Sequence, residues 1–98
     1  MIQHMRVEDR VLAMRSTGRS YGAIARTVGF ASAREAHDAF LLALRRRPHA
    51  EQAELRDQEL GRLDDLARQL RDQRAMNEEE LADKLGVLDR LRELLLTV

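Results

Sequence analysis

The chain has 98 residues, of which 44% are hydrophobic and only 3% aromatic, and it contains no cysteine. This length limits it to one small domain, or to one domain with an extension. The missing cysteine excludes a disulfide framework, a zinc–thiolate site and a cysteine nucleophile. No apolar run is long enough to cross a bilayer, the leucine triplet at residues 94–96 included. Residues 1–5 lack the regions of a signal peptide. We therefore expect a cytoplasmic protein with no membrane partner.

The formal net charge is zero, and it hides an asymmetry between the two halves of the chain. Residues 1–49 carry nine arginines against four carboxylates, a net charge of +5, whereas residues 50–98 carry eight basic and thirteen acidic residues, a net charge of −5. A basic head followed by an acidic tail favours a nucleic-acid-binding domain joined to an assembly segment. A helical protein with unevenly charged solvated faces is the alternative.

Strand signals are missing, so the sequence predicts an all-α protein with five helices. The first helix covers about residues 6–16, and Gly18 ends it. The second covers about residues 21–28. It begins after the N-cap Ser20 and stops at Gly29, whose backbone permits the turn that follows.

The third helix begins after Ser32, because Ser32 and Glu35 have the spacing of a capping box. Pro48 ends it, since a proline disfavours helical geometry in the residue before it. Hydrophobic periodicity divides the helix into two faces. We expect Ala36, Phe40, Ala43 and Leu44 to point inward, and Arg34, His37, Asp38 and Leu41 to point away from the core.

The segment 19–30 is typical of the first helix and turn of a helix-turn-helix. Ala25 and Gly29 allow a second helix to pack closely at a steep angle, which is how many small proteins present a helix to the major groove of DNA. An ordinary helical pair with glycine at the corner is the alternative. The capping box and the flanking arginines favour the DNA-binding interpretation for a three-helix domain over residues 1–48.

The geometry of this motif predicts which residues contact double-stranded DNA. The start of the third helix would face base edges, where arginine is the commonest reader of guanine. The start of the second helix would hold a phosphate. The arginines at the end of the third helix would contact phosphates, although they would serve equally as a cationic helix end. The predicted contacts are Ser32, Ala33, Arg34 and His37 with bases, with Asp38 as a further candidate, Arg19, Ser20 and Tyr21 with one phosphate, and Arg45, Arg46 and Arg47 with others.

Two acidic residues of the third helix, Glu35 and Asp38, oppose this binding because they repel phosphate. Strong affinity would then require several copies bound together.

Residues 49–98 are predicted to form two further helices. The fourth has Pro48 at its first position and extends to about Arg74, and the fifth follows a cap formed by Asn77 and Glu80. Their leucines recur at helical spacing, which suits both an intrachain hairpin core and a subunit interface. We expect this helical hairpin to form a homo-oligomer through Leu60, Leu63, Leu66, Leu70, Leu81, Leu85, Leu88, Leu91 and Leu95.

Catalysis has no support in the sequence. His4, His37 and His49 are far apart, and Glu35, His37 and Asp38 project to different sides of one helix. The chain has no phosphate-binding glycine loop and no nucleophile elbow. We expect no enzymatic activity, no metal and no cofactor.

Four segments occur in a familiar order: GRSYGAIA at residues 18–25, VGF at 28–30, SAREA at 32–36 and, most specifically, ELRDQELGRLD at 54–64. Together they resemble small helix-turn-helix proteins of actinobacterial phages, many of which look like terminase small subunits. The similarity covers most of residues 7–70.

The resemblance implies recognition of viral DNA before genome packaging, in the cytosol of a bacterium or of a phage-infected host. Terminase small subunits oligomerise and deliver DNA to a large subunit, which holds the ATPase and nuclease. By position, Ser20, Tyr21, Ser32 and Arg34 would touch DNA, and residues 50–98 would assemble the oligomer. A transcriptional regulator with a dimeric tail, and a protein-interaction adaptor that no longer contacts DNA, are the alternatives.

Overall fold

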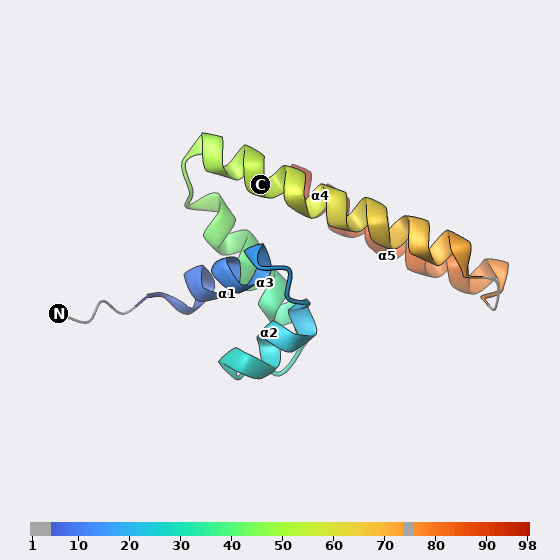
Figure 1. Cartoon of the computed structure of the whole chain (residues 1–98), viewed down its shortest axis with the longest axis horizontal. Helices are drawn as coiled ribbons and strands as arrows, with labels where there is room; N and C mark the ends of the chain where they lie inside the picture. The colour runs from blue at the N-terminus through green and yellow to red at the C-terminus, as the bar shows by residue number, and fades with distance from the viewer. Residues whose placement is uncertain (1–4, 74–75) are drawn as a thin grey trace. The chain divides into compact units, whose positions relative to one another are not determined.

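The computed structural model describes residues 5–73 and 76–98. Residues 1–4, part of the segment 1–5 in which we expected no signal peptide, lie outside these residues, as does the expected end of the fourth helix at Arg74. The described residues form five α-helices and no strand, which confirms the all-α prediction (Figure 1). The helices are α1 (Val7–Ser16), α2 (Tyr21–Val28), α3 (Ala33–Arg45), α4 (His49–Asp72) and α5 (Glu78–Leu96).

The chain divides into two compact units, one ending at Gln52 and the other beginning at Ala53. The division falls after the first turn of α4, so α1, α2, α3 and that turn belong to the first unit. The second unit holds the rest of α4 and all of α5.

Helix α3 is the centre of the first unit, because α1 and α2 both pack against it as well as against each other (Figure 1). The predicted inward face of α3 is confirmed, but Leu41, which we expected to point outward, is only 5% exposed. Because α3 packs against two helices, it buries a wider part of its circumference than a helix with one neighbour, and Leu41 lies within that buried part. The buried apolar residues of this unit are Val11, Leu12, Ile24, Ala25, Ala36, Phe40, Leu41, Ala43 and Leu44.

Two glycines end the first two helices in the left-handed backbone conformation, as predicted. Gly18 has φ +94°, and its N–H donates to the carbonyl of Arg15 at 2.9 Å. Gly29 has φ +87°, and its N–H donates to the carbonyl of Ala25 at 2.9 Å. A side chain at either position would face the steric penalty that L-residues meet in this region, so glycine sets both turns.

Serine caps begin α2 and α3. The hydroxyl of Ser20 accepts the N–H of Ala23 at 3.2 Å, and that of Ser32 accepts the N–H of Glu35 at 3.3 Å. The Glu35 carboxylate reaches back to the N–H of Ala31 at 2.9 Å, one residue earlier than a standard capping box requires. The carboxylate is therefore held at the turn before α3.

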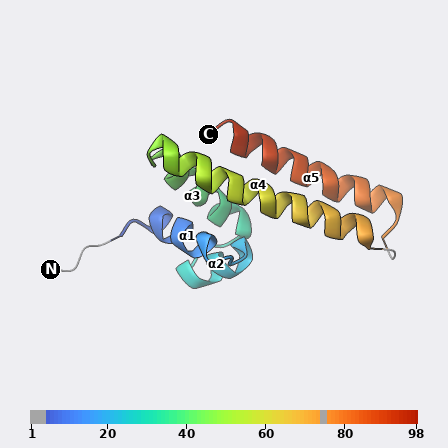
Figure 2. The ribbon, with the colours of Figure 1, turned by 45° about the horizontal axis from the view of Figure 1, so that its top comes forward.

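In the second unit, α4 and α5 lie side by side and run in opposite directions (Figures 1 and 2). The Arg56 guanidinium donates to the carbonyl oxygen of Val98 at 2.9 Å, and Arg92 pairs with Asp64. Asn77 caps α5 by accepting the N–H of Glu80 at 2.8 Å. No described helix has both the length and the apolar character needed to cross a membrane.

Candidate nucleic-acid interface

The outer surface of α3 begins with two of the predicted base contacts, Ala33 and Arg34, and both are exposed. One turn further along the helix comes Asp38, followed by Leu42 and Arg45, which are also exposed. Residues spaced by three or four positions share one helix face. The structure therefore presents a continuous outward line along α3, which we call the α3 outer face: Arg34, Asp38, Leu42 and Arg45.

Tyr21 and His37, both predicted DNA contacts, lie against each other where α2 meets α3. Both are half-buried. Their ring centroids are 5.1 Å apart, with an interplanar angle of 87°. The Tyr21 and Phe40 rings also form an edge-to-face pair, with centroids 5.9 Å apart. Such edge-to-face pairs favour burial of the rings. The two side chains hold the first turn of α2 against α3, and His37 lies to the side of the α3 outer face.

The same cluster contains Arg15, which the sequence reasoning missed. Arg15 is only 8% exposed, and its guanidinium carbon lies 4.2 Å from the centroid of the Tyr21 ring. Its Nη1 also donates to the backbone carbonyl of Arg19 at 2.8 Å. Its spacing gave a signal, because Arg15 follows the core residues Val11 and Leu12 by four and three positions, and so lies on the buried face of α1.

The predicted phosphate contact at the start of α2 is only partly available. Arg19 has an exposed side chain, although its backbone carbonyl is occupied by Arg15. Ser20 is exposed, and its hydroxyl is engaged as the N-cap of α2. Ser32, at the start of α3, is exposed and engaged in the same way.

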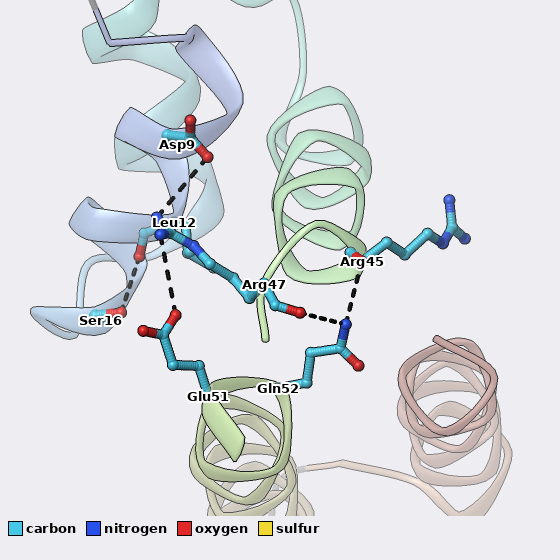
Figure 3. Close-up of polar contacts among 7 residues, drawn as sticks. All are labelled: Asp9, Leu12, Ser16, Arg45, Arg47, Glu51 and Gln52. Carbon is cyan, nitrogen blue, oxygen red and sulfur yellow. Dashed lines mark hydrogen bonds and ion pairs between the residues drawn. The ribbon is translucent and has the colours of Figure 1, made fainter. Parts of the chain in front are cut away.

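The three consecutive arginines at the end of α3 do not form one surface. Arg45 and Arg46 are exposed, whereas Arg47 is half-buried and lies between α1 and the first turn of α4 (Figure 3). Its Nη2 is 3.8 Å from a carboxylate oxygen of Asp9, and its Nη1 is 3.9 Å from one of Glu51. The Arg45 guanidinium points away from this group in the same view. Arg47 therefore faces other parts of the first unit.

Gln52 completes this corner of the first unit. Its side-chain amide donates to the backbone carbonyls of Arg45 at 3.1 Å and Arg47 at 2.8 Å (Figure 3). Carbonyls at a helix C-terminus lack intrahelical partners, so Gln52 provides the donor that the end of α3 needs. Its backbone N–H donates to Pro48 at 2.9 Å, which places Pro48 just before the first helical residue of α4 instead of at that residue.

The charges of the first unit are distributed unevenly between paired and free groups. Up to Gln52 the chain has nine arginines and five carboxylates, a net charge of +4. Asp9 and Glu51 lie beside Arg47, and Glu35 accepts a backbone N–H. Seven arginines are exposed and form no ion pair with another described residue: Arg6, Arg10, Arg19, Arg26, Arg34, Arg45 and Arg46. Most of the positive charge therefore faces solvent.

The predicted interface leucines of the second unit fall into three groups. Leu63 and Leu95 are buried within the chain, at 6% and 2% exposure, and Leu66 is 43% exposed. The remaining six, Leu60, Leu70, Leu81, Leu85, Leu88 and Leu91, are half-buried. Further exposed apolar side chains are those of Val87, Leu94 and Leu96. Leu63 and Leu95 thus offer no free surface to a partner, whereas Leu66 does.

A groove of about 400 Å³ also lies between α4 and α5. Arg68, Arg71 and Arg92 line it together with Asp64 and Asp89. Because both signs of charge are present, the groove favours no particular charge on a ligand.

Among residues 5–73 and 76–98, no group of three or more histidine, aspartate or glutamate side chains is placed to hold a metal ion. No family model, curated protein or solved structure matches the chain.

Proposed function

We propose that this chain is a non-enzymatic protein that binds double-stranded DNA through the first unit, with α2 and α3 acting as a helix-turn-helix. The observation that carries the proposal is the α3 outer face, which exposes Arg34 near the start of a capped helix. The first unit also carries seven exposed arginines that form no ion pair with another described residue, so most of its positive charge faces solvent. Phosphate contacts of this kind supply most of the sequence-independent affinity of DNA-binding proteins.

The lengths of the elements support the helix-turn-helix interpretation. Helix α2 has eight residues, and Gly29 begins a short connection that ends at the cap of α3, Ser32. The aromatic contact between Tyr21 and His37 braces α2 on α3. In such a motif the second helix enters the major groove, and the first crosses the backbone.

Self-association through the second unit is the second part of the proposal. Two helices alone cannot enclose a core, and among the described residues of the second unit only Leu63, Ala67 and Leu95 are buried apolar residues. Leu66 and Leu94 remain 43% exposed, and Leu96 is 57% exposed. A second copy of the chain would cover these side chains and would place two or more DNA-binding units in one particle.

Genome packaging, with delivery of DNA to a large terminase subunit, is the specific role that the sequence resemblance favours. It rests on the segments at residues 18–36 and 54–64 alone. A transcriptional regulator would use the same first unit, and particle stoichiometry separates the two roles. A ring of many subunits favours packaging, whereas a dimer on a palindromic site favours regulation.

The test is a titration of the full chain into a fluorescently labelled duplex, followed by anisotropy, at about 50 and about 200 mM salt. Binding should weaken with salt, by about 0.9 in log K per tenfold change in salt for each phosphate neutralised. Arg34→Ala should weaken binding to a preferred duplex by about fivefold to a hundredfold. Arg90→Ala, at an exposed arginine of the second unit, is the matched control. No binding to any duplex at either salt concentration would refute the proposal.

A further inference from the structure

The α3 outer face contains one carboxylate, that of Asp38, which makes no contact that would stabilise the fold. Asp38 is exposed, and its side chain forms no hydrogen bond or ion pair with another described residue. The other acidic residue of α3, Glu35, is held by the N–H of Ala31. Asp38 is therefore the acidic group of α3 that is free to meet a ligand.

The position of Asp38 matters because of its neighbours. Arg34 lies one helical turn before it and Arg45 two turns after it on the same exposed face. His37, the adjacent residue, turns aside to contact Tyr21. The side chain that follows Arg34 along this face is thus a carboxylate and not an imidazole.

A carboxylate in the middle of a phosphate-binding surface weakens binding to every DNA sequence, because it repels phosphate. In the major groove the same group has a specific partner, since aspartate accepts a hydrogen bond from the N4 amino group of cytosine. Four residues advance about 6 Å along a helix, and stacked base pairs are about 3.4 Å apart. Arg34 and Asp38 are therefore spaced to reach base pairs one or two steps apart.

We infer that Asp38 is a specificity-determining residue, which accepts a hydrogen bond from cytosine one or two base pairs away from a guanine read by Arg34. This inference rests on the proposed function and adds the sequence preference of the same site. Asp38 lowers the affinity for unrelated DNA and raises the selectivity for a site that contains cytosine at the matching position.

The test is selection of bound duplexes from a randomised library by the full-length protein, followed by affinity measurements on the enriched site and on an unrelated duplex. The wild-type protein should enrich a guanine and a cytosine one or two base pairs apart. Asp38→Asn should lose about tenfold to a hundredfold of the discrimination for cytosine, and it should bind the unrelated duplex more tightly. Asp57→Asn, at an exposed aspartate of α4, should change neither quantity.

The outcomes separate the two proposals. DNA binding with the same base preference in Asp38→Asn as in the wild-type protein would overturn the role of Asp38 and leave the proposed function intact. Binding to no duplex by the wild-type protein would overturn both. Circular dichroism checks that each variant keeps its helices, and Asp38→Ala provides a second variant that removes the carboxylate without adding a donor.

Discussion

The side-chain amide of Gln52 donates a hydrogen bond of 3.1 Å to the backbone carbonyl of Arg45, the last residue of α3. The same amide donates to Arg47 at 2.8 Å. One residue from the first turn of α4 thus provides donors for the C-terminal end of the preceding helix. Arg47 meets Asp9 and Glu51 beside it, so the end of α3 is held by polar contacts on two sides (Figure 3).

Replacement of Gln52 by alanine should destabilise the first unit. Two carbonyl oxygens lose their side-chain donor, and each hydrogen bond of this kind contributes about 1 kcal/mol. We expect the free energy of unfolding to fall by about 1–2 kcal/mol, measured by urea denaturation followed by circular dichroism. Gln58→Ala is the control, because Gln58 is exposed and forms no side-chain bond with another described residue. Equal stability of the two variants would show that water replaces the amide at no cost.

The three arginines at the end of α3 should differ in how much they contribute to DNA affinity. Arg45 and Arg46 are exposed, so their joint replacement by alanine should lower affinity for all duplexes and reduce the salt dependence by about one phosphate for each arginine. Arg47→Ala should change DNA affinity far less, because Arg47 lies between Asp9 and Glu51. A larger loss of affinity from Arg47→Ala than from the double variant would contradict this division.

Much of the fold follows from local signals in the sequence. Helix ends are determined by residues close in the chain, such as Gly29 and Ser32. The ends of the helices can therefore be predicted from the sequence alone. The hydrogen bonds from Gln52 to the end of α3 depend on how the chain turns at Pro48. Leu41 is buried because α3 packs against two helices. These contacts arise from packing, which residue spacing within one helix does not reveal.

In the candidate site, too, some features could be predicted from the sequence and others depend on packing. The exposure of Arg34 follows from its place on an amphipathic helix. The burial of Arg15 under the Tyr21 ring requires a contact between α1 and α2, and the separation of Arg47 from Arg45 requires one between the end of α3 and α1. An arginine signals positive charge in a sequence, but only packing decides whether that charge faces solvent.

Arg15→Lys should destabilise the first unit although it keeps the positive charge. Lysine lacks the planar guanidinium that stacks on the Tyr21 ring and bonds to the Arg19 carbonyl. A cation–π contact shielded from water contributes about 1–2 kcal/mol. We therefore expect the free energy of unfolding to fall by about that amount, measured by thermal unfolding. Arg10→Lys, at an exposed position of the same helix, serves for comparison and should leave the Tm unchanged.

Two glycine-to-alanine variants should have opposite effects. Gly29 has φ +87°, so Gly29→Ala forces an L-residue into the left-handed region and should cost about 1–2 kcal/mol. Gly61 lies within α4 with open space around it, so Gly61→Ala should add helix propensity and stabilise by about 1 kcal/mol. Differential scanning calorimetry measures both. Stabilisation by Gly29→Ala would show that the turn after α2 relaxes readily.

Self-association can be tested by two leucine variants that differ in burial. Leu66 is 43% exposed and Leu63 is 6% exposed on the same helix. Leu66→Glu places a charge on the proposed contact surface while leaving the buried residues of the second unit intact. It should therefore reduce the particle mass, measured by multi-angle light scattering, with no loss of helix. Leu63→Glu places the charge among buried side chains and should unfold the second unit, which circular dichroism detects. A wild-type protein with the mass of one chain would refute self-association. An oligomer whose mass Leu66→Glu leaves unchanged would show that another surface joins the copies.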